Sequence, residues 1–170
     1  MFSPTIRWLL VAVSLGFGFH HLSGGRWLGL LFVAGGLLLG AGHFLYGSVR
    51  AAFGALRRGD LQRAAALLER TPTRWLTPET RAYHAWVEAA LAEARGRLPE
   101  ARDALGRALE LPLRSDRDRV LALGTLAAIH AKLGEREAGL ERLAEAEALD
   151  PAPRVRPLLD RVRGQLEKRS

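Results

Sequence analysis

The chain has 170 residues, which is room for one domain of ordinary size and a short appendage and argues against a multidomain enzyme. It contains no cysteine, so disulfide scaffolds, thiolate zinc sites and thiol nucleophiles are excluded. The formal charge of +7 is unevenly placed, because all 18 acidic side chains follow Arg50 whereas the first 50 residues contain only three arginines. We therefore expect the two parts of the chain to lie in different solvents.

The first part of the chain is rich in apolar, uncharged residues. Residues 27–46, WLGLLFVAGGLLLGAGHFLY, carry no formal charge, and at a rise of about 1.5 Å per residue they reach roughly the 30 Å thickness of a bilayer core. A shorter apolar run occupies residues 6–22. No small-x-small cleavage site follows it and the second run begins soon after, which argues against the alternative of a cleaved secretory signal. We predict a transmembrane helical hairpin over residues 1–46, with spans at about 6–22 and 27–46.

The placement of arginine predicts how this hairpin is oriented. Arg7 flanks the first span, Arg50 and Arg57 follow the second, and Arg26 lies in the loop between them. Positively charged flanks stay in the cytoplasm. We therefore expect a multi-pass protein of a bacterial inner membrane, with the lipid bilayer as one partner and with both termini and the remaining chain in the cytoplasm.

Glycines and histidines within the hairpin suggest what it contacts. Two pairs of glycines are four residues apart and would share a helix face: Gly25 and Gly29, and Gly36 and Gly40. We expect these pairs to let two helices pack closely, within the hairpin or at a dimer seam. Three histidines lie at opposite ends of the predicted spans, so we expect no shared metal site: His20, His21 and His43.

An internal repeat begins after the hairpin. Three segments can be aligned, GDLQRAAALLERTP, GRLPEARDALGRALELP and GEREAGLERLAEAEALDP, and their first residues are Gly59, Gly96 and Gly134. The glycines recur at intervals of 37 and 38 residues. A period of this size in a helical pattern predicts helix pairs that stack into a solenoid, each glycine ending one helix and opening the turn to the next.

These positions resemble the tetratricopeptide repeat (TPR) family, in which a turn glycine is followed by a helix with small alanines and a closing proline. The matching residues are Gly59, Ala64, Leu68 and Pro72, then Gly96, Ala101, Ala108 and Pro112, then Gly134, Leu143, Ala146 and Asp150-Pro151. Two positions of the third copy depart from the family pattern, Gly139 in place of alanine and His130 in place of tyrosine. The resemblance implies an all-α protein with about three TPR-like helix pairs in residues 45–170, at about 45–72, 78–112 and 117–151.

The two ends of the predicted solenoid differ. Residues 152–168 are expected to form a capping helix, since its apolar residues share one face: Val155, Leu158, Leu159, Val162 and Leu166. At the other end, no proline or polar cluster separates the second span from the first repeat helix. We expect that span to continue into the repeat as one helix. A hinge at Gly47 is the alternative.

The resemblance further implies a protein-binding scaffold with a concave groove lined by the first helix of each pair. The groove positions carried over from the family are Val49, Phe53, Leu56 and Arg57, then Tyr83, Trp86, Ala90 and Glu93, then Leu121, Ala128 and Lys132. Partner contacts are expected from six of these: Phe53, Arg57, Tyr83, Trp86, Glu93 and Lys132. The alternative for Tyr83 and Trp86 is that they fill space beside the long linker after Pro72.

No catalytic motif accompanies the repeats, so we expect no enzyme activity, no cofactor and no bound metal. His84 and His130 each lie on a first helix of a repeat, where a packed role is expected rather than a catalytic one. The basic carboxyl end lacks aromatic residues for base stacking, so we do not expect nucleic-acid binding. The expected function is a membrane-anchored adaptor that binds a partner protein or peptide. The alternative is an assembly subunit of a larger membrane complex.

Overall fold

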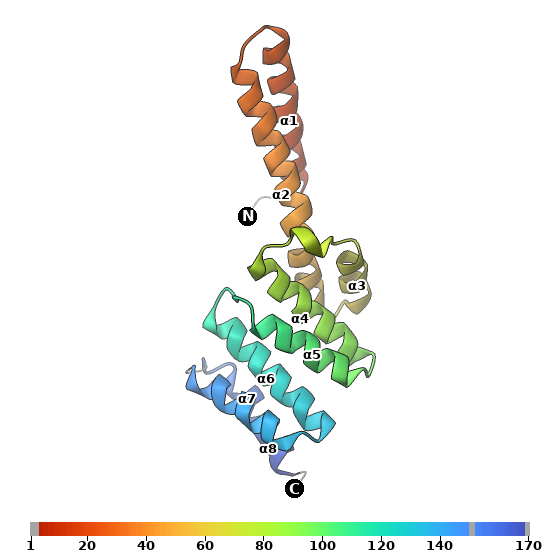
Figure 1. The fold of residues 1–170 in the computed structure, drawn as a ribbon, viewed down its shortest axis with the longest axis vertical. Helices are drawn as coiled ribbons and strands as arrows, with labels where there is room; N and C mark the ends of the chain where they lie inside the picture. The colour runs from red at the N-terminus through yellow and green to blue at the C-terminus, as the bar shows by residue number, and fades with distance from the viewer. Residues whose placement is uncertain (1–3, 150–151, 169–170) are drawn as a thin grey trace. The chain divides into compact units, whose positions relative to one another are not determined.

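The computed structural model describes residues 4–149 and 152–168, without the side chains of residues 4–8, 39, 41–47 and 75. Within these ranges the chain is helical and contains no strand, in agreement with the all-α prediction (Figure 1). The chain divides into two compact units, Met1–Ser48 and Val49–Ser170.

The first unit is a helical hairpin. Helix α1 (Pro4–Ser23) and the beginning of helix α2 (Leu28–Arg57) are joined by a short turn in which Gly25 has a positive φ of 71°. The two helices approach through glycines. A Cβ atom placed on Gly29 would lie 2.5 Å from the carbonyl oxygen of Gly18, and one placed on Gly36 would lie 3.0 Å from the side chain of Leu15. Any larger residue at Gly29 would therefore force the two backbones apart.

The structure contradicts the transmembrane part of the sequence prediction. Among the described residues, no helix combines the length and the hydropathy needed to cross a bilayer. In α1, Arg7, Ser14 and the two histidines near its end lower the hydropathy of the sequence. On the described residues, the predicted spans 6–22 and 27–46 and the placement in a bacterial inner membrane with cytoplasmic termini are therefore wrong.

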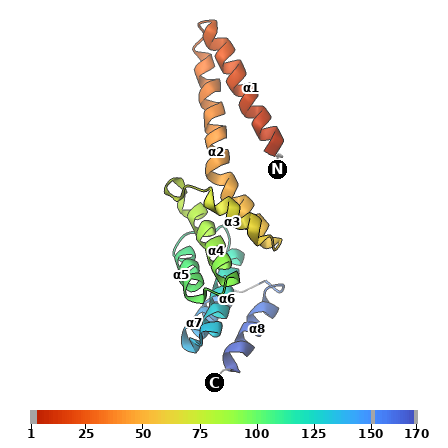
Figure 2. The ribbon, with the colours of Figure 1, turned by 90° about the vertical axis from the view of Figure 1, so that its right-hand side faces the viewer.

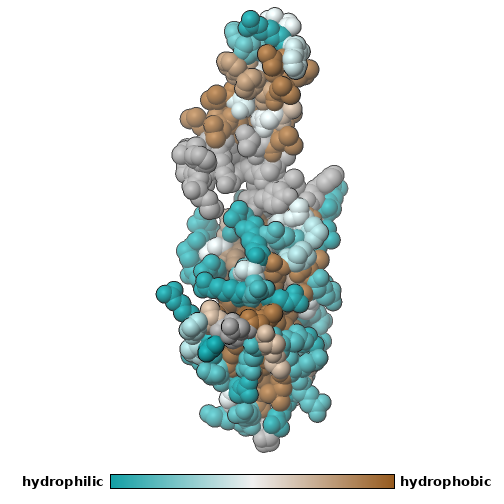
Figure 3. Space-filling view, turned by 90° about the vertical axis from the view of Figure 1, so that its left-hand side faces the viewer, coloured by the Kyte–Doolittle hydropathy of each residue, from teal (hydrophilic) through white to brown (hydrophobic). Residues whose placement is uncertain are grey.

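The described surface of the hairpin is nevertheless largely apolar. Most of the described large apolar side chains on the two helices are between 42% and 73% exposed, and brown atoms mark apolar surface on this unit in Figure 3. The most exposed of them are Leu9, Phe19, Leu31 and Leu38, and Trp27 in the turn between the helices is 70% exposed. Packing between α1 and α2 uses the glycine faces of the helices, so most of the large side chains point away from the helix contact.

Helix α2 contributes to both units, since its residues 28–48 belong to the first and residues 49–57 to the second. Its helical backbone includes Gly47, where the sequence left continuity and a hinge as alternatives. The side chains around that position, including the histidine at position 43, lie outside the described ones.

The second unit consists of helices that alternate in direction along the chain (Figures 1 and 2). After α2 come α3 (Leu61–Glu69), the short 3₁₀ helix η1 (Thr73–Trp75), α4 (Pro78–Ala94), α5 (Leu98–Leu109), α6 (Asp116–Leu133), α7 (Arg136–Ala148) and α8 (Arg156–Glu167). Hydroxyl side chains cap the starts of α4 and α6, where Thr77 accepts from the amide of Thr80 and Ser115 from that of Asp118. The Asp150-Pro151 pair that was expected to close the third repeat lies outside the described residues.

The three repeated glycines occupy equivalent turns. Gly59, Gly96 and Gly134 have φ values of 81°, 74° and 80°, the left-handed conformation that glycine adopts without strain. In each turn the amide after the glycine donates to a carbonyl five residues earlier: Asp60 to Ala55, Arg97 to Ala92 and Glu135 to His130, at 2.9 to 3.0 Å. This is the hydrogen-bond pattern of a Schellman motif. The pairs α2–α3, α4–α5 and α6–α7 therefore turn back in the same way.

Three apolar clusters run through the stacked helix pairs. The first joins α2, α4, α5 and α6 around Trp86, Leu105 and Ile129. The second joins α6, α7 and α8 around Leu123, Leu143 and Leu159, and the third places α3 against α2 and α4. Alanines occupy many of the crossing points and are fully buried, among them Ala52, Ala55, Ala64, Ala101, Ala108, Ala127 and Ala146. Such small side chains let helix axes approach closely.

Helix α8 covers the open end of the second cluster. Val155, Leu159, Val162 and Leu166 are between 1% and 4% exposed, whereas the opposite face carries charged residues. Glycines on the neighbouring helices receive two of these side chains. A Cβ atom on Gly124 would lie 2.8 Å from Leu159, and one on Gly139 would lie 2.6 Å from Leu166. Gly139, the departure from the repeat pattern, therefore makes room for the terminal helix.

Candidate functional site

A groove opens in the second unit where three successive first helices of the repeats meet. Its cavity of about 350 Å³ is lined by the end of α2, the middle of α4, and the N-cap and first three turns of α6. Four of the lining residues are large and apolar, and the rest are polar or charged: Phe53, Leu56, Trp86 and Leu121, then Arg57, Ser115, Arg117, Asp118 and Thr125. The groove thus has an apolar floor and a polar rim.

Aromatic contacts build the floor of the groove. The ring of Phe53 lies 5.1 Å from that of Tyr83 and 5.1 Å from that of Trp86, in both cases edge to face, and Tyr83 and Trp86 are stacked at 6.1 Å. Tyr83 and Trp86 are each 8% exposed, so they belong mainly to the core. Phe53, Leu56 and Leu121 are half-buried and supply the accessible apolar surface.

Below the groove, a polar network fixes the start of α6 to α4. The hydroxyl of Tyr83 donates to the carboxylate of Asp118 at 2.5 Å and accepts the backbone amide of Arg114 at 3.2 Å. The guanidinium of Arg114 lies 5.7 Å from the centre of the Tyr83 ring and also pairs with Glu79. Burial, followed by the hydrogen bond to Asp118, raises the pKa of Tyr83 from 10.0 to about 12.

This shift predicts how stability depends on pH in the alkaline range. Because the folded state holds the Tyr83 proton more tightly than the unfolded state, the contribution of Tyr83 is complete below pH 10.0 and is lost as the pH rises toward about 12. We expect the free energy of unfolding to fall across this range, and to fall less in Tyr83→Phe. Tyrosinate absorbance in a Tyr46→Phe background should show Tyr83 ionising near the upper value. Ionisation near 10.0 would contradict the network.

Two arginines stand at the rim of the groove. Arg57 is the last residue of α2 and Arg117 lies in the first turn of α6, and both side chains are exposed. Within the described part of the chain, neither guanidinium makes an ion pair with a carboxylate, whereas Asp118 is occupied by Tyr83. The rim therefore presents net positive charge.

Other predicted groove residues lie elsewhere. Glu93 and Lys132 form an ion pair, Nζ to Oε1 at 2.6 Å, that links α4 to α6 away from the cavity. Val49 is completely buried in the core, and Ala90 and Ala128 are half-buried outside the cavity lining. The structure thus brings together Phe53, Leu56, Arg57, Trp86 and Leu121, places Tyr83 directly beneath them, and leaves the Glu93–Lys132 pair apart.

Of the glycines singled out in the hairpin, three face α1 and one lies in the turn. Gly29 and Gly36 face α1 at close range, and a Cβ atom on Gly40 would meet Val11 at an ordinary 4.0 Å. Gly25 lies in the turn and not on a helix face. Gly18 was not singled out from the sequence, although it forms the other side of the Gly29 contact. The two glycines of α1, Gly16 and Gly18, are only two residues apart, and their spacing gave no indication that Gly18 is the one that meets α2.

A second cleft lies between α3, α4 and α5 and was not anticipated from the sequence. It has a volume of about 430 Å³, an apolar floor that includes Leu68 and Leu91, and charged walls. Several wall charges neutralise one another, since Glu88 lies 3.5 Å from Arg107 and Glu100 lies 2.7 Å from Arg97. In the sequence, the spacing of these charged residues is that of any exposed helix face. It therefore gave no signal of a cleft.

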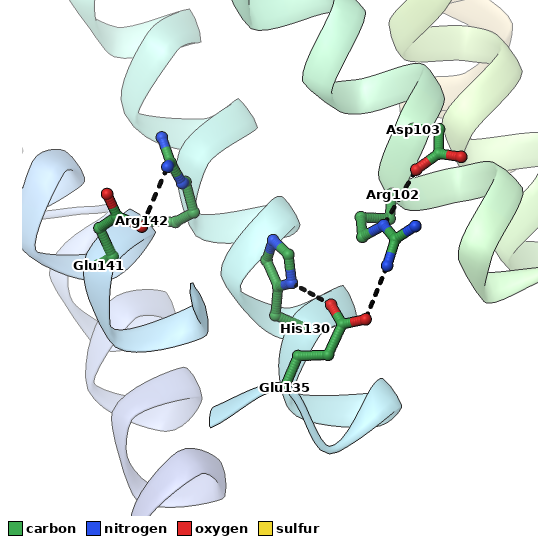
Figure 4. Close-up of polar contacts among 6 residues, drawn as sticks. All are labelled: Arg102, Asp103, His130, Glu135, Glu141 and Arg142. Carbon is green, nitrogen blue, oxygen red and sulfur yellow. Dashed lines mark hydrogen bonds and ion pairs between the residues drawn. The ribbon is translucent and has the colours of Figure 1, made fainter. Parts of the chain in front are cut away.

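The two repeat histidines are held by carboxylates. His130 is buried, and its Nδ1 lies 2.6 Å from Glu135, which also accepts from Arg102 at 2.7 Å (Figure 4). The bond from His130 and the nearby Arg102 hold the pKa of Glu135 below its ordinary value. Burial lowers the pKa of His84, with Glu88 opposing the shift. Among the residues that the structure describes, no three carboxylate or imidazole side chains gather as metal ligands would.

Comparison with known proteins does not assign the chain to a group. No family model, no curated protein and no solved structure matches it.

Proposed function

We propose that the second unit is a TPR-like scaffold that binds a partner protein or peptide in the groove between α2, α4 and α6. The supporting observation is the cavity itself, because its apolar lining comes from the first helices of three successive helix pairs. Stacked repeats create continuous concave surfaces of this kind, and such surfaces serve recognition.

The size and chemistry of the groove favour side-chain recognition. A cavity of about 350 Å³ lies at the small end of ligand clefts and matches one or two large apolar side chains. Accessible apolar residues surround a rigid aromatic floor, so little side-chain freedom is lost when a partner docks. Asp118, the carboxylate of the lining, is fixed by Tyr83 in a structural network, which favours binding over acid–base chemistry.

A site-specific crosslinking experiment tests the proposal. A photoreactive residue replaces Leu121, which lines the cavity, and in a matched sample it replaces Arg119, which is exposed on the same helix outside the lining. We expect a discrete partner to be captured from cells only with the Leu121 position. Filling the cavity by Thr125→Trp should abolish the capture. Equal capture at both positions, or capture unaffected by Thr125→Trp, would refute the groove as the binding site.

A further inference from the structure

We infer that the groove takes an acidic partner segment, in which one bulky apolar side chain enters the cavity and carboxylates on either side meet Arg57 and Arg117. This inference rests on the proposed function of the groove and names the chemistry of its partner. The inference uses the position of the charged side chains around the cavity. The proposed function uses a different observation, the apolar lining.

The apolar half of the argument comes from the cavity floor. Phe53 and Leu121 face the cavity from α2 and α6, and Trp86 closes the floor from α4. The edge-to-face contacts of Phe53 with Tyr83 and Trp86 hold the floor in one arrangement. The cavity leaves the upper side of this floor uncovered. A leucine, methionine or phenylalanine side chain from a partner would pack there.

The charged half comes from the two rim arginines. Phe53 of α2 contacts Trp86 of α4, and Asp118 of α6 accepts from Tyr83 of α4, so α4 lies between the two helices that carry the rim arginines. Arg57 and Arg117 thus stand on opposite sides of the floor, and in the described part of the chain no carboxylate pairs with either. The carboxylate of the lining, Asp118, is already bound by a hydroxyl at 2.5 Å. A segment that enters between the two guanidiniums meets positive charge on both sides, which acidic residues complement.

Two charge-reversal variants of the full chain provide a matched comparison. The pocket variant carries Arg57→Glu and Arg117→Glu. The control carries Arg58→Glu and Arg119→Glu, which changes the net charge equally at neighbouring exposed arginines outside the lining. Both leave the buried core untouched, so neither is expected to alter folding.

The probe is a phage-displayed library of random peptides, selected on the unmodified chain, with the enriched peptides then made with a fluorescent label for anisotropy titrations. We expect enrichment of a large apolar residue flanked by aspartate or glutamate. Binding should weaken about tenfold in the pocket variant and less than about twofold in the control, and it should weaken as salt is added. Selection on the pocket variant should yield lysine or arginine in place of the acids.

The outcomes separate this inference from the proposed function. Enrichment of neutral or basic peptides that are displaced by Thr125→Trp would overturn the acidic partner while leaving the groove as a binding site. Equal weakening in the two charge variants would also overturn it, because overall charge and not the rim arginines would then explain the binding. Failure of every enriched peptide to respond to Thr125→Trp would overturn the proposed function itself.

Discussion

Replacing Leu166 by alanine is expected to lower the free energy of unfolding by about 2–5 kcal/mol, the range for a leucine removed from a well-packed core. Leu166 is 1% exposed and lies over Gly139, where a Cβ atom would come within 2.6 Å of one of its methyl carbons. The site cannot collapse easily, because Gly139 has no side chain that could move into the space. Leu166 therefore fills a hole that the rest of the chain leaves open.

Chemical denaturation followed by helical circular dichroism measures the effect. Gln165→Ala is the matched control, since Gln165 is the exposed neighbour on the same helix. We expect its effect to stay within about 0.5 kcal/mol. A loss for Leu166→Ala no larger than that of the control would mean that α8 does not pack against α6 and α7.

The reciprocal change tests the fit between the two residues. Gly139→Ala gains about 1 kcal/mol of helix propensity but places a methyl group into the space of Leu166 and 3.3 Å from the Cβ of His130. We expect a net destabilisation of about 1–3 kcal/mol in the unmodified chain. Combined with Leu166→Ala, the same methyl group refills part of the hole. The two changes should therefore show a coupling energy of about 0.5–3 kcal/mol in a double-mutant cycle.

The turns and helix faces of the second unit were accessible from the sequence because they depend on local chemistry. Gly59, Gly96 and Gly134 were expected to open turns, and each has the positive φ that a Schellman turn needs. The apolar face expected for residues 152–168 corresponds to the buried side chains of α8. In these cases a three-to-four-residue spacing or a single glycine determines the outcome, whatever lies elsewhere in the chain.

Contacts between helices were less accessible, because they depend on crossing geometry and on rotamers. Glu93 and Lys132, 39 residues apart, were each expected to face a partner, yet they pair with each other. Trp86 was expected as a partner contact; its ring packs against Phe53 and Tyr83, and the residue is 8% exposed where it lines the cavity. Gly139 departs from the alanine of the repeat pattern, and the structure supplies the reason, because the side chain of Leu166 occupies the space of a Cβ atom there. The hairpin shows a different limit of sequence analysis. The uncharged run of residues 27–46 was enough to predict a helix, but not whether that helix crosses a membrane.

Replacing Gly29 by leucine is expected to separate the helices of the first unit. Even a Cβ atom at this position would lie 2.5 Å from the carbonyl oxygen of Gly18 and 2.8 Å from the amide nitrogen of Leu22. Both of those atoms belong to the backbone, so no side-chain rotation can relieve the overlap. The helices must move apart, and the contacts around Gly18 and Gly36 are then lost together. We expect a loss of about 1–3 kcal/mol or more from the packing of the hairpin, despite the better helix propensity of leucine.

Spin labels report this separation directly. The chain has no native cysteine, so Val13→Cys and Leu37→Cys give uniquely labelled, exposed sites on the two helices. Gly29→Leu should lengthen and broaden the distance distribution between the labels. Gly35→Leu is the matched control, because nothing lies within 4 Å of a Cβ atom at Gly35, and it should leave the distribution unchanged. Since leucine adds the same apolar side chain to α2 in both variants, a difference between them reports the close approach of Gly29 to Gly18 and Leu22. Identical distributions would show that the helices do not meet there.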